Sequence, residues 1–511
     1  MGPVKMHVYR DLIQPNRPEN NFLIHKVLRP VFIRRTNITM SGKETNKELR
    51  RISSLLRDSK SGQLPDEATI NSLRTIDRKT IMHPFTPLSG WERDPFSLIT
   101  GAEGSYLVNE KGEKLLDGTA SLWVNLLGHK NPIIDQAIRD QLNRWAHSTF
   151  LGLSHEPGIL LAQELLDIAP KGLTRVFFSD NGSTAVEAAL KLSYLSHPRK
   201  RSNTPPSRFV SFSQSYHGDT LGAVGVGGID RFHQEFGPLL RPSIKVPSPD
   251  CFRCPVGLEK NSCHMECFEL FRKTLTTHKD ETCAVICEPL LQAAGGMIVW
   301  PQGYLSKIRS LTRELDIPLI LDEVATGFGR TGAMFASSLE DVSPDFLCLG
   351  KGLTGGYLPL AATIMTERIY ENIRESPGAF FHGHSFTANP LGVAAARATL
   401  ALLKDNRLIS EVPRKNAIAQ QILKDLTSPL PGVKNFRSIG LIVAMDLYAG
   451  ETPFSSDKMD SLRQLCHEQG MIIRPLGNIA YLFPPLSVST TEWMTMCRIL
   501  GESIVTCQTN H

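Results

Sequence analysis

Five short apolar runs, separated from one another by segments with a helical pattern, constrain the fold of this 511-residue chain more than any other feature. The runs cover residues 176–179, 209–212, 284–287, 318–321 and 346–349. Short continuous apolar runs are typical of strands that are buried on both faces. Because these runs alternate with helices, we predict an α/β fold whose mainly parallel sheet is covered on both sides.

The two ends of the chain carry a different pattern, which indicates a smaller second domain. Residues 104–108 and 114–117 read as two strands of a hairpin around a turn at 109–112. From about residue 400 onward, an amphipathic helix is followed by strands near 441–445 and 472–474. This mixture of helix and strand predicts a small α+β domain.

These patterns divide the chain into an extension and two domains. Residues 1–80 lack a long apolar period and read as a basic extension that is poorly ordered or accessory. The large domain is predicted over 136–395, with a cysteine-rich insertion at 250–268. The small domain is predicted to combine residues 81–135 with residues 396–511.

The net charge of +5 comes from the N-terminal extension. Residues 1–80 hold 16 Lys and Arg against 8 Asp and Glu, whereas the rest of the chain holds 40 against 43. The acid-poor stretch between Glu19 and Glu44 resembles an organellar transit peptide, but Asp11 and Glu19 do not fit that composition. We expect a helix around residues 47–57. We also expect a cytoplasmic protein, or a mitochondrial one if the extension contains a transit peptide.

The composition excludes several classes of protein. No stretch approaches the roughly 18 consecutive apolar residues of a membrane-spanning helix, so no membrane partner is expected. The mildly acidic body of the chain argues against a nucleic-acid partner. Ten cysteines without an apparent signal peptide do not resemble a secreted disulfide framework, so we expect a reducing compartment.

Two features predict an anion site and a buried acid. Residues 179–184 follow one apolar run and open a helix over 185–194, with Gly182 and Ser183 at its start. Free N–H groups and the helix dipole favour a phosphate there, although a plain N-cap has the same sequence. Asp322 ends another run, where open α/β sheets bind ligands, although aspartate is also common at loop entrances.

Two further residues predict imine chemistry beside a planar ring. Lys351 emerges from the run 346–349 into glycines, where desolvation would lower the pKa of its amine and free it as a nucleophile. The alternative is a structural lysine paired with a carboxylate. Tyr216 follows the run 209–212 and could stack on a ring or be an ordinary core tyrosine. Together with the anion site and Asp322, these residues are what pyridoxal phosphate requires.

From about His83 onward, the chain resembles the class III aminotransferases over more than four fifths of its length. The most specific stretch runs from Asp322 through Arg330 to Lys351. Further matching motifs are His83-Pro-Phe-Thr, Ser121-Leu-Trp, Tyr216-His-Gly-Asp-Thr, His382-Gly-His-Ser and Arg474-Pro-Leu-Gly with Tyr481. The resemblance implies a fold-type I transferase that binds pyridoxal 5′-phosphate. Such a fold has a large domain with a mainly parallel seven-stranded sheet and a smaller α+β domain formed by both chain ends.

The resemblance also implies a role for each residue of the cofactor site. Lys351 would bind the cofactor as an imine and then carry protons, and Asp322 would pair with the pyridine nitrogen. Tyr216 would stack on the ring and contact the substrate. The phosphate ligands would come from both subunits of a homodimer: Gly182 and Ser183 from one, His384 and Ser385 from the other.

Within the class, the motifs are most similar to the branch that converts 8-amino-7-oxononanoate to 7,8-diaminononanoate in biotin synthesis. Arg474 would hold the substrate carboxylate, because the arginine fork matches that group. Gly383 and Tyr481 would lie nearby, and Arg330 would help the amino donor to fit. The other candidates for substrate binding are Phe85, Leu122 and Trp123.

The amino donor stays open at this point. The branch that uses S-adenosylmethionine typically has Tyr where this chain has Phe85 and Trp where it has Leu122. Other motifs look more like the branch that uses L-lysine. We expect S-adenosylmethionine, with lysine as the alternative. A different class III ω-amino-acid transaminase is the nearest rival, and the presence of Lys351 and Asp322 argues against a non-enzymatic scaffold.

Four cysteines in the predicted insertion have the ligand count of a zinc site. They are Cys251, Cys254, Cys263 and Cys267. The first spacing suits zinc, but the gap of eight residues before the second pair is short for a zinc ribbon. Four free thiols in a surface insertion are the expected arrangement, and zinc is the alternative. No catalytic metal is predicted.

Overall fold

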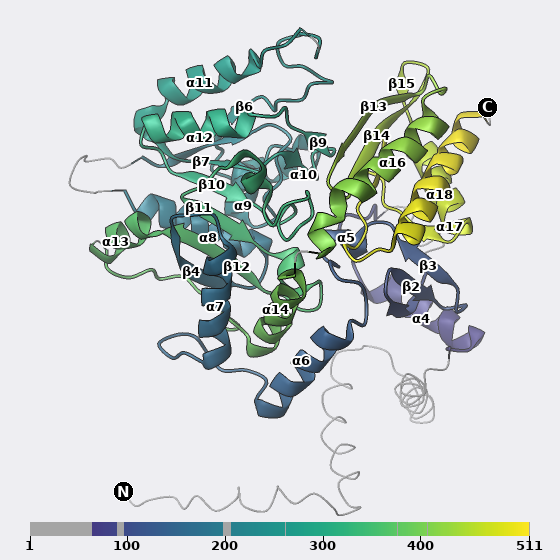
Figure 1. Cartoon of the computed structure of the whole chain (residues 1–511), viewed down its shortest axis with the longest axis horizontal. Helices are drawn as coiled ribbons and strands as arrows, with labels where there is room; N and C mark the ends of the chain where they lie inside the picture. The colour runs from purple at the N-terminus through teal and green to yellow at the C-terminus, as the bar shows by residue number, and fades with distance from the viewer. Residues whose placement is uncertain are drawn as a thin grey trace, which may run out of the picture. The chain divides into compact units, whose positions relative to one another are not determined.

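The computed structural model of the chain describes residues 64–88, 97–197, 206–260, 262–375, 377–405 and 407–509 (Figure 1). The chain divides into two compact units, Met1–Asp94 and Pro95–His511. The predicted helix around 47–57 lies outside the described residues. In the first unit, helix α4 (Glu67–Thr80) begins at Asp66, whose side chain accepts a hydrogen bond from the backbone N–H of Thr69 at 2.7 Å.

A seven-stranded sheet forms the centre of the second unit. Its strands, in spatial order, are β4 (Leu173–Ser179), β12 (Ala361–Thr366), β11 (Phe346–Leu349), β10 (Leu319–Asp322), β7 (Thr282–Cys287), β5 (Arg208–Phe212) and β6 (Ile244–Val246). Within this sheet β12 alone runs opposite to the other six strands. The mainly parallel sheet is therefore confirmed, and the five apolar runs correspond to β4, β5, β7, β10 and β11.

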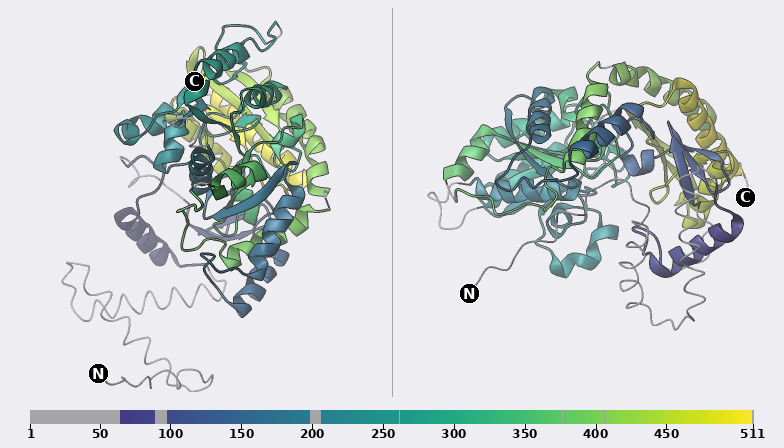
Figure 2. Two further views of the ribbon diagram at one scale, coloured as in Figure 1. Left: turned by 90° about the vertical axis from the view of Figure 1, so that its left-hand side faces the viewer. Right: turned by 90° about the horizontal axis from the view of Figure 1, so that it is seen from below.

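Helices cover both faces of this sheet, as the views in Figures 1 and 2 show. They include α7 (Glu156–Ile168), α8 (Gly182–Leu195), α11 (Cys267–Thr277), α12 (Tyr304–Glu314), α13 (Glu367–Glu375) and α14 (Pro390–Leu403). Successive residues of one strand enter different cores, because side chains alternate between the faces of a sheet. Leu319 and Leu321 join one apolar cluster, while Ile320 between them joins another. Burial on both faces explains the continuous apolar runs in the sequence.

The described residues of the second unit also form two four-stranded sheets and a two-stranded one, in which β8 (Leu291–Gln292) pairs with β9 (Ile298–Val299). In one of the four-stranded sheets, β14 (Ile442–Ala449) pairs with β13 (Val433–Ile439), β15 (Thr452–Pro453) and β17 (Ile479–Leu482). In the other, β1 (Ile99–Glu103), β2 (Tyr106–Asn109) and β3 (Lys114–Asp117) form antiparallel pairs, and β3 also pairs with β16 (Met471–Ile472). Three helices pack in this part of the chain: α16 (Val412–Thr427), α17 (Ser456–Glu468) and α18 (Thr490–Thr509).

Strand β3 precedes the strands of the large sheet in the sequence and β16 follows them, yet the two pair with each other. A small domain built from both chain ends requires a pairing of this kind. The predicted hairpin also forms, since β2 and β3 are antiparallel neighbours. The domain boundaries at residues 80, 135 and 395 stay predictions.

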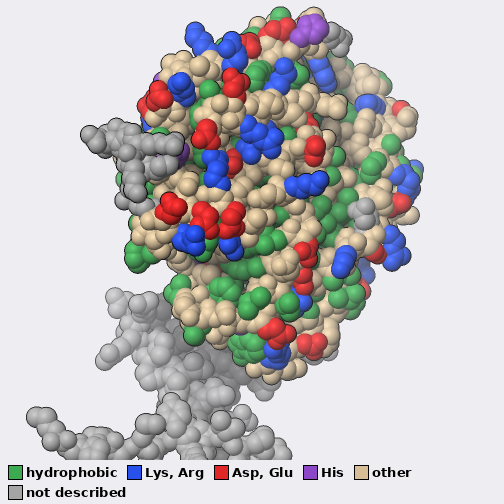
Figure 3. Space-filling model, turned by 60° about the vertical axis from the view of Figure 1, so that its left-hand side comes forward, with side chains coloured by type: hydrophobic (Ala, Val, Ile, Leu, Met, Phe, Trp, Pro, Cys, Tyr) green, Lys and Arg blue, Asp and Glu red, His purple; other side chains and the backbone are tan. Residues whose placement is uncertain are grey.

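On the face drawn in Figure 3, Lys and Arg side chains lie among Asp and Glu side chains, with apolar groups between them. Among the described residues, no helix has the length and apolar character needed to cross a membrane.

Candidate functional site

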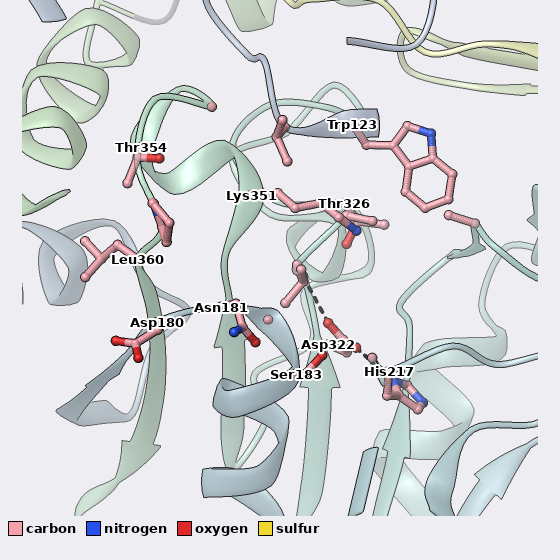
Figure 4. Close-up of a pocket in the computed structure, with 18 of the residues that line it drawn as sticks. Trp123, Asp180, Asn181, Ser183, His217, Asp322, Thr326, Lys351, Thr354 and Leu360 are labelled. Carbon is pink, nitrogen blue, oxygen red and sulfur yellow. Dashed lines mark hydrogen bonds and ion pairs between the residues drawn. The ribbon is translucent and has the colours of Figure 1, made fainter. Parts of the chain in front are cut away.

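A cavity of about 420 Å³ lies where five strands of the large sheet end. The side chains that line it follow β4, β5, β7, β10 and β11 in the sequence. They include six residues labelled in Figure 4, Asp180, Asn181, Ser183, His217, Asp322 and Lys351, and also Tyr216 and Glu288. Because the carboxyl ends of parallel strands meet at one edge of a sheet, residues far apart in the sequence converge there.

The start of helix α8 forms one wall of the cavity. Asn181 caps the helix, and its side chain accepts a hydrogen bond from the backbone N–H of Thr184 at 3.1 Å. Gly182 lies so close to Val324 that a Cβ atom at this position would come within 2.6 Å of a Val324 methyl group. Gly218 has φ +113°, and a Cβ atom there would lie 1.9 Å from Ser183 Oγ. The backbone N–H groups in the first turn of α8 have no acceptor within the helix. The two glycines leave open space in front of these groups.

Asp322 ends β10 and is 5% exposed. His217 Nδ1 lies 2.7 Å from Asp322 Oδ2, and the backbone N–H of Val324 donates to Oδ1 at 3.1 Å (Figure 4). The other ring nitrogen of His217, Nε2, is buried and has no partner among the described residues. The histidine and the backbone therefore fix the orientation of the carboxylate.

Lys351 follows β11 and reaches into the same cavity (Figure 4). Its Nζ lies 4.8 Å from the ring centroid of Trp123. Burial lowers the pKa of the Lys351 amine, whereas the Asp322 and Glu288 carboxylates oppose that shift. A lowered pKa increases the fraction of free amine near neutral pH, which a nucleophilic lysine requires.

Tyr216 and Glu288 form another part of the lining. The Tyr216 hydroxyl donates a hydrogen bond to Asp219 at 2.6 Å, and burial raises its pKa. Glu288 is 5% exposed and accepts hydrogen bonds from the backbone N–H groups of Tyr216 and Ala293, both at 3.2 Å. Burial, followed by the nearby Asp322 carboxylate, raises the pKa of Glu288 well above its ordinary value.

The sequence analysis missed Glu288 and His217. A signal for Glu288 was present, because it directly follows the apolar run 284–287 in the way that Asp322 follows 318–321. His217 lies in the matching motif Tyr216-His-Gly-Asp-Thr, but nothing in that motif indicated its pairing with Asp322, which lies 105 residues away in the sequence.

A left-handed turn supplies the aromatic wall of the cavity. The short helical segment α5 (Ala120–Trp123) has four consecutive residues with positive φ, of 48°, 47°, 65° and 71°. Each such L-residue costs about 1 to 2 kcal/mol relative to a right-handed conformation. Trp123 is nevertheless 6% exposed and well packed, stacking on Phe483 at 5.4 Å and donating from Nε1 to the Tyr481 hydroxyl at 3.3 Å.

Arg330 is the most deeply buried cation near the site, at 1% exposure. Its Nη1 donates to the carbonyl oxygen of Pro484, and its guanidinium lies 4.5 Å from the ring centroid of Phe483. Nη2 is buried without a partner among the described residues. Burial lowers the pKa of Arg330 to about 9, and the Asp117 carboxylate opposes the shift. A guanidinium buried in this way is suited to binding an anion.

Glu323 holds the loop that carries Arg330. Its carboxylate is 0% exposed and accepts hydrogen bonds from Thr326 Oγ1 at 2.6 Å and from the backbone N–H groups of Ala336 and Ser337 at 2.9 and 2.8 Å. Burial raises the pKa of Glu323, and these hydrogen bonds oppose the shift. Three donors on one carboxylate fix both ends of the loop.

Replacing Glu323 by glutamine is expected to destabilise the fold by about 2 kcal/mol, because the amide would face at least one backbone N–H donor with a donor of its own. Thermal unfolding followed by circular dichroism measures the effect. Glu314→Gln on the exposed side of α12 is the control, with an expected change of less than about 0.5 kcal/mol. An unchanged unfolding midpoint for Glu323→Gln would show that the loop does not depend on this carboxylate.

Several predicted substrate residues of the second unit do not line the cavity. Leu122 is about half exposed, at 46%, as is Phe85 in the first unit, at 52%. Gly383 and Arg474 are exposed. Tyr481 is buried beside Trp123, and burial raises its pKa to about 12 while Arg474 opposes that shift. Their roles in substrate binding stay predictions.

The predicted phosphate ligands from a second subunit lie in the segment before α14. His384 is half-buried, and its Nδ1 lies 3.5 Å from Oδ2 of Asp180 at the cavity. Ser385 is exposed. The contribution of these two residues across a dimer stays a prediction.

The two predictions for the cysteine cluster, free thiols and a zinc site, both stay predictions. Cys251, Cys254 and Cys263 are half-buried, Cys267 is buried, and no disulfide joins these four described residues. Within the described residues, which leave out Asn261 in this segment, no three His, Cys, Asp or Glu side chains come close enough to hold a metal ion.

The residues present fit pyridoxal phosphate. The glycine-lined helix start accepts a phosphate, Asp322 supplies a held carboxylate for a ring nitrogen, and Lys351 supplies an amine with a lowered pKa. The unpartnered Nε2 of His217 and the open space beside Tyr216 leave room for a polar aromatic group.

Comparison with known proteins agrees with this arrangement. The family model described as aminotransferase class-III matches residues 89–504. The chain is 44% identical to the adenosylmethionine-8-amino-7-oxononanoate aminotransferase of Geobacter sulfurreducens, over 84% of this chain and 96% of that protein. It is 39% identical to the protein of the same name from Staphylococcus aureus, over 84% and 97%.

Solved structures show the same likeness. The crystal structure of adenosylmethionine-8-amino-7-oxononanoate aminotransferase from Methanocaldococcus jannaschii has a TM-score of 0.80 and 37% identity, covering 86% of this chain and 99% of that one. An omega transaminase from Pseudomonas jessenii in complex with PMP has a TM-score of 0.80 and 27% identity, covering 85% and 98%.

Proposed function

Because the chain belongs to the class III aminotransferases, which depend on pyridoxal phosphate, we propose that it transfers an amino group to 8-amino-7-oxononanoate and so makes 7,8-diaminononanoate for biotin synthesis. The observation that carries the reaction type is the convergence of Lys351, Asp322 and the start of α8 on one cavity. The choice of keto acid is supported by relatives at 34–44% identity that are named adenosylmethionine-8-amino-7-oxononanoate aminotransferase.

The cofactor, when bound, supplies an electron-withdrawing ring that stabilises negative charge on the substrate carbon. The chain's own residues would hold and orient it. The N–H groups at Gly182 and Ser183 would bind the phosphate, and Asp322, oriented by His217, would pair with the ring nitrogen. Tyr216 lines the same cavity and would cover the ring.

Lys351 would carry the proton that transamination moves between two carbon atoms. Its Nζ is a base when neutral and an acid when protonated. A lowered pKa brings the populations of these two states closer together near neutral pH. Trp123, stacked on Phe483, would shield one side of this amine from water.

The substrate carboxylates would be bound by arginines. Arg330 offers a buried Nη2 without a partner among the described residues, and Arg474 lies close enough to Tyr481 to influence its pKa. We assign the long keto acid to Arg474, in line with the resemblance, and the amino donor to Arg330. Bidentate pairing with guanidinium suits both carboxylates.

Replacing Arg474 by alanine is expected to raise the KM for 8-amino-7-oxononanoate by about 10- to 100-fold, the worth of a hydrogen bond to a charged group, with a smaller change in kcat. Steady-state kinetics at saturating donor measure both constants. Arg474→Lys is the matched control and should recover part of the loss, because it keeps the charge without the fork. An unchanged KM would assign the carboxylate to another residue.

The visible spectrum of the holoenzyme tests the proposed function and identifies the donor. The absorption band of the lysine-bound cofactor should disappear with the true donor and return when 8-amino-7-oxononanoate is added. Bleaching by S-adenosylmethionine supports the expected donor. Bleaching by L-lysine alone would identify lysine as the donor and leave the proposed reaction of 8-amino-7-oxononanoate unchanged. If the band fails to return with 8-amino-7-oxononanoate but returns with other keto acids, the chain is a different class III transaminase.

We also propose that the active enzyme is a homodimer. Around the segment of His384 and Ser385 the single chain exposes large apolar side chains that soluble monomers rarely leave open. They are Leu151 (63%), Leu153 (61%), Phe381 (96%) and Phe386 (60%). Sedimentation velocity of the holoenzyme should give a mass of two chains, and a monomer with full activity would contradict this proposal.

A further inference from the structure

We propose that Asp117 is a positioning residue of the active site: through Ser121 it holds the left-handed turn Ala120–Trp123 and so places the Trp123 ring against the Lys351 amine. This inference rests on the proposed function, because Lys351 and its cavity are the site of that reaction. Asp117 does not line the cavity and lies outside the motifs that carry the family resemblance.

Asp117 is built into the turn by three hydrogen bonds. It ends strand β3 and is 1% exposed. Its Oδ1 accepts from the backbone N–H of Ser121 at 2.9 Å, and its Oδ2 accepts from the Ser121 hydroxyl at 2.7 Å. His129 Nε2 lies 3.2 Å from the same Oδ2. Both oxygens of a buried carboxylate are thus committed to keeping one serine in place.

The turn needs such an anchor because its residues do not favour the conformation. Ala120, Ser121, Leu122 and Trp123 all have positive φ, a region that side chains other than glycine rarely adopt, and none of them is glycine. Strain of this kind persists only where the surrounding structure imposes it, and it concentrates at functional sites. Asp117 bonds to the second of the four residues.

The turn places the Trp123 ring beside Lys351, the reacting lysine. The indole is stacked on Phe483 and bonded to the Tyr481 hydroxyl, and its ring centroid lies 4.8 Å from Lys351 Nζ. In Figure 4 Trp123 and Lys351 come from different segments of the chain. If the turn relaxed toward negative φ, the indole would swing away from the amine, and both Lys351 and the substrate would lose this wall.

A double-mutant cycle separates positioning from a merely structural role. Asp117→Asn and Trp123→Leu are made singly and together. The matched control is Glu340→Gln, since Glu340 accepts from the backbone N–H and the hydroxyl of Ser306 at 2.9 and 3.0 Å, as Asp117 does from Ser121, but lies outside the cavity lining. The first readout is the rate at which apoprotein captures pyridoxal phosphate, seen as growth of the visible band. The second is KM against kcat for 8-amino-7-oxononanoate.

We expect Asp117→Asn to slow capture and to raise KM by about tenfold, the loss of one hydrogen bond to a charged group. Trp123→Leu should have an effect of similar size, because it removes the ring that Asp117 positions. The double variant should be within about twofold of Trp123→Leu, because both changes act through the same ring. Glu340→Gln should capture cofactor at the wild-type rate even if its unfolding midpoint falls. Losses that multiply in the double variant, or an Asp117→Asn variant that behaves like Glu340→Gln, would overturn the proposal.

Two further outcomes are distinguishable. If Asp117→Asn does not fold, Ser121→Ala replaces it, since it removes only the hydroxyl bond, and about a threefold effect is expected. If the wild-type protein does not aminate 8-amino-7-oxononanoate, the proposed function fails, yet the capture rates still decide the role of Asp117.

Discussion

Replacing Lys351 by alanine is expected to abolish transamination and to remove the visible absorption band of lysine-bound cofactor. Among the described residues that line the cavity, Lys351 is the only lysine, so no neighbouring amine can take its place. Loss of both a covalent attachment and a proton carrier should reduce kcat by at least about 10⁴-fold. The spectrum of cofactor-supplemented protein and a coupled amine assay measure the two effects.

Lys351→Met is the matched control, because it keeps the length and most of the volume of the side chain while removing the amine. It should retain the wild-type unfolding midpoint and still bind pyridoxal phosphate without the visible band. Either variant turning over at more than a few per cent of the wild-type rate would show that Lys351 is not the reacting lysine.

The lowered pKa of Lys351 gives this prediction a pH dependence. Capture of cofactor needs the neutral amine, so the capture rate rises with pH up to the amine pKa and then levels off. Because burial lowers that pKa, the plateau should begin at a lower pH than for an exposed lysine. A rate that keeps rising to the ordinary pKa of lysine, about 10.4, would show that the amine is not desolvated.

Replacing Asp322 by asparagine is expected to lower kcat by about 10²- to 10³-fold, the range for removal of one preorganised electrostatic partner. An amide cannot hold a protonated ring nitrogen as a carboxylate does. It would also bring a donor against either His217 or the N–H of Val324, which now donate to the two oxygens. Single-turnover bleaching of the visible band by the donor isolates this step from substrate binding.

Asp345→Asn is the control for Asp322. Asp345 is equally buried, at 5% exposure, and accepts hydrogen bonds from Arg309 and from the backbone N–H of Leu319 at the other end of β10. Its replacement should reduce stability and leave the single-turnover rate nearly unchanged. If the two variants lose the same fraction of that rate, Asp322 supports the fold and not the reaction.

Much of the fold could be predicted because the signals are local. A strand buried on both faces must be apolar at successive positions, so β5, β7, β10 and β11 can be recognised in the sequence as short apolar runs. Strand β12 (Ala361–Thr366) was missed, since its short run of Ala and Thr gives a weak signal and its antiparallel place between β4 and β11 depends on residues far away.

The candidate site was predictable to the same extent. Parallel strands bring their carboxyl ends together, so Asp322 and Lys351, each at the end of an apolar run, had to share one edge of the sheet. Arg330 was expected near the substrate from resemblance alone. Its complete burial, with Nη2 unpartnered among the described residues, depends on Phe483 and Pro484, more than 150 residues later.

The sequence by itself determined five of the seven strands of the large sheet, the placement of Asp322 and Lys351 at the ends of two of them and, through family resemblance, the cofactor. These follow from periodicity and position along the chain, which the sequence contains directly. Only the tertiary structure decided the pairing of His217 with Asp322, the burial of Glu288 and the left-handed turn at Ala120–Trp123. No local preference produces positive φ at Ala, Ser, Leu and Trp in succession. That conformation exists because Asp117 holds it and because Tyr481 and Phe483, brought near by folding, offset its cost.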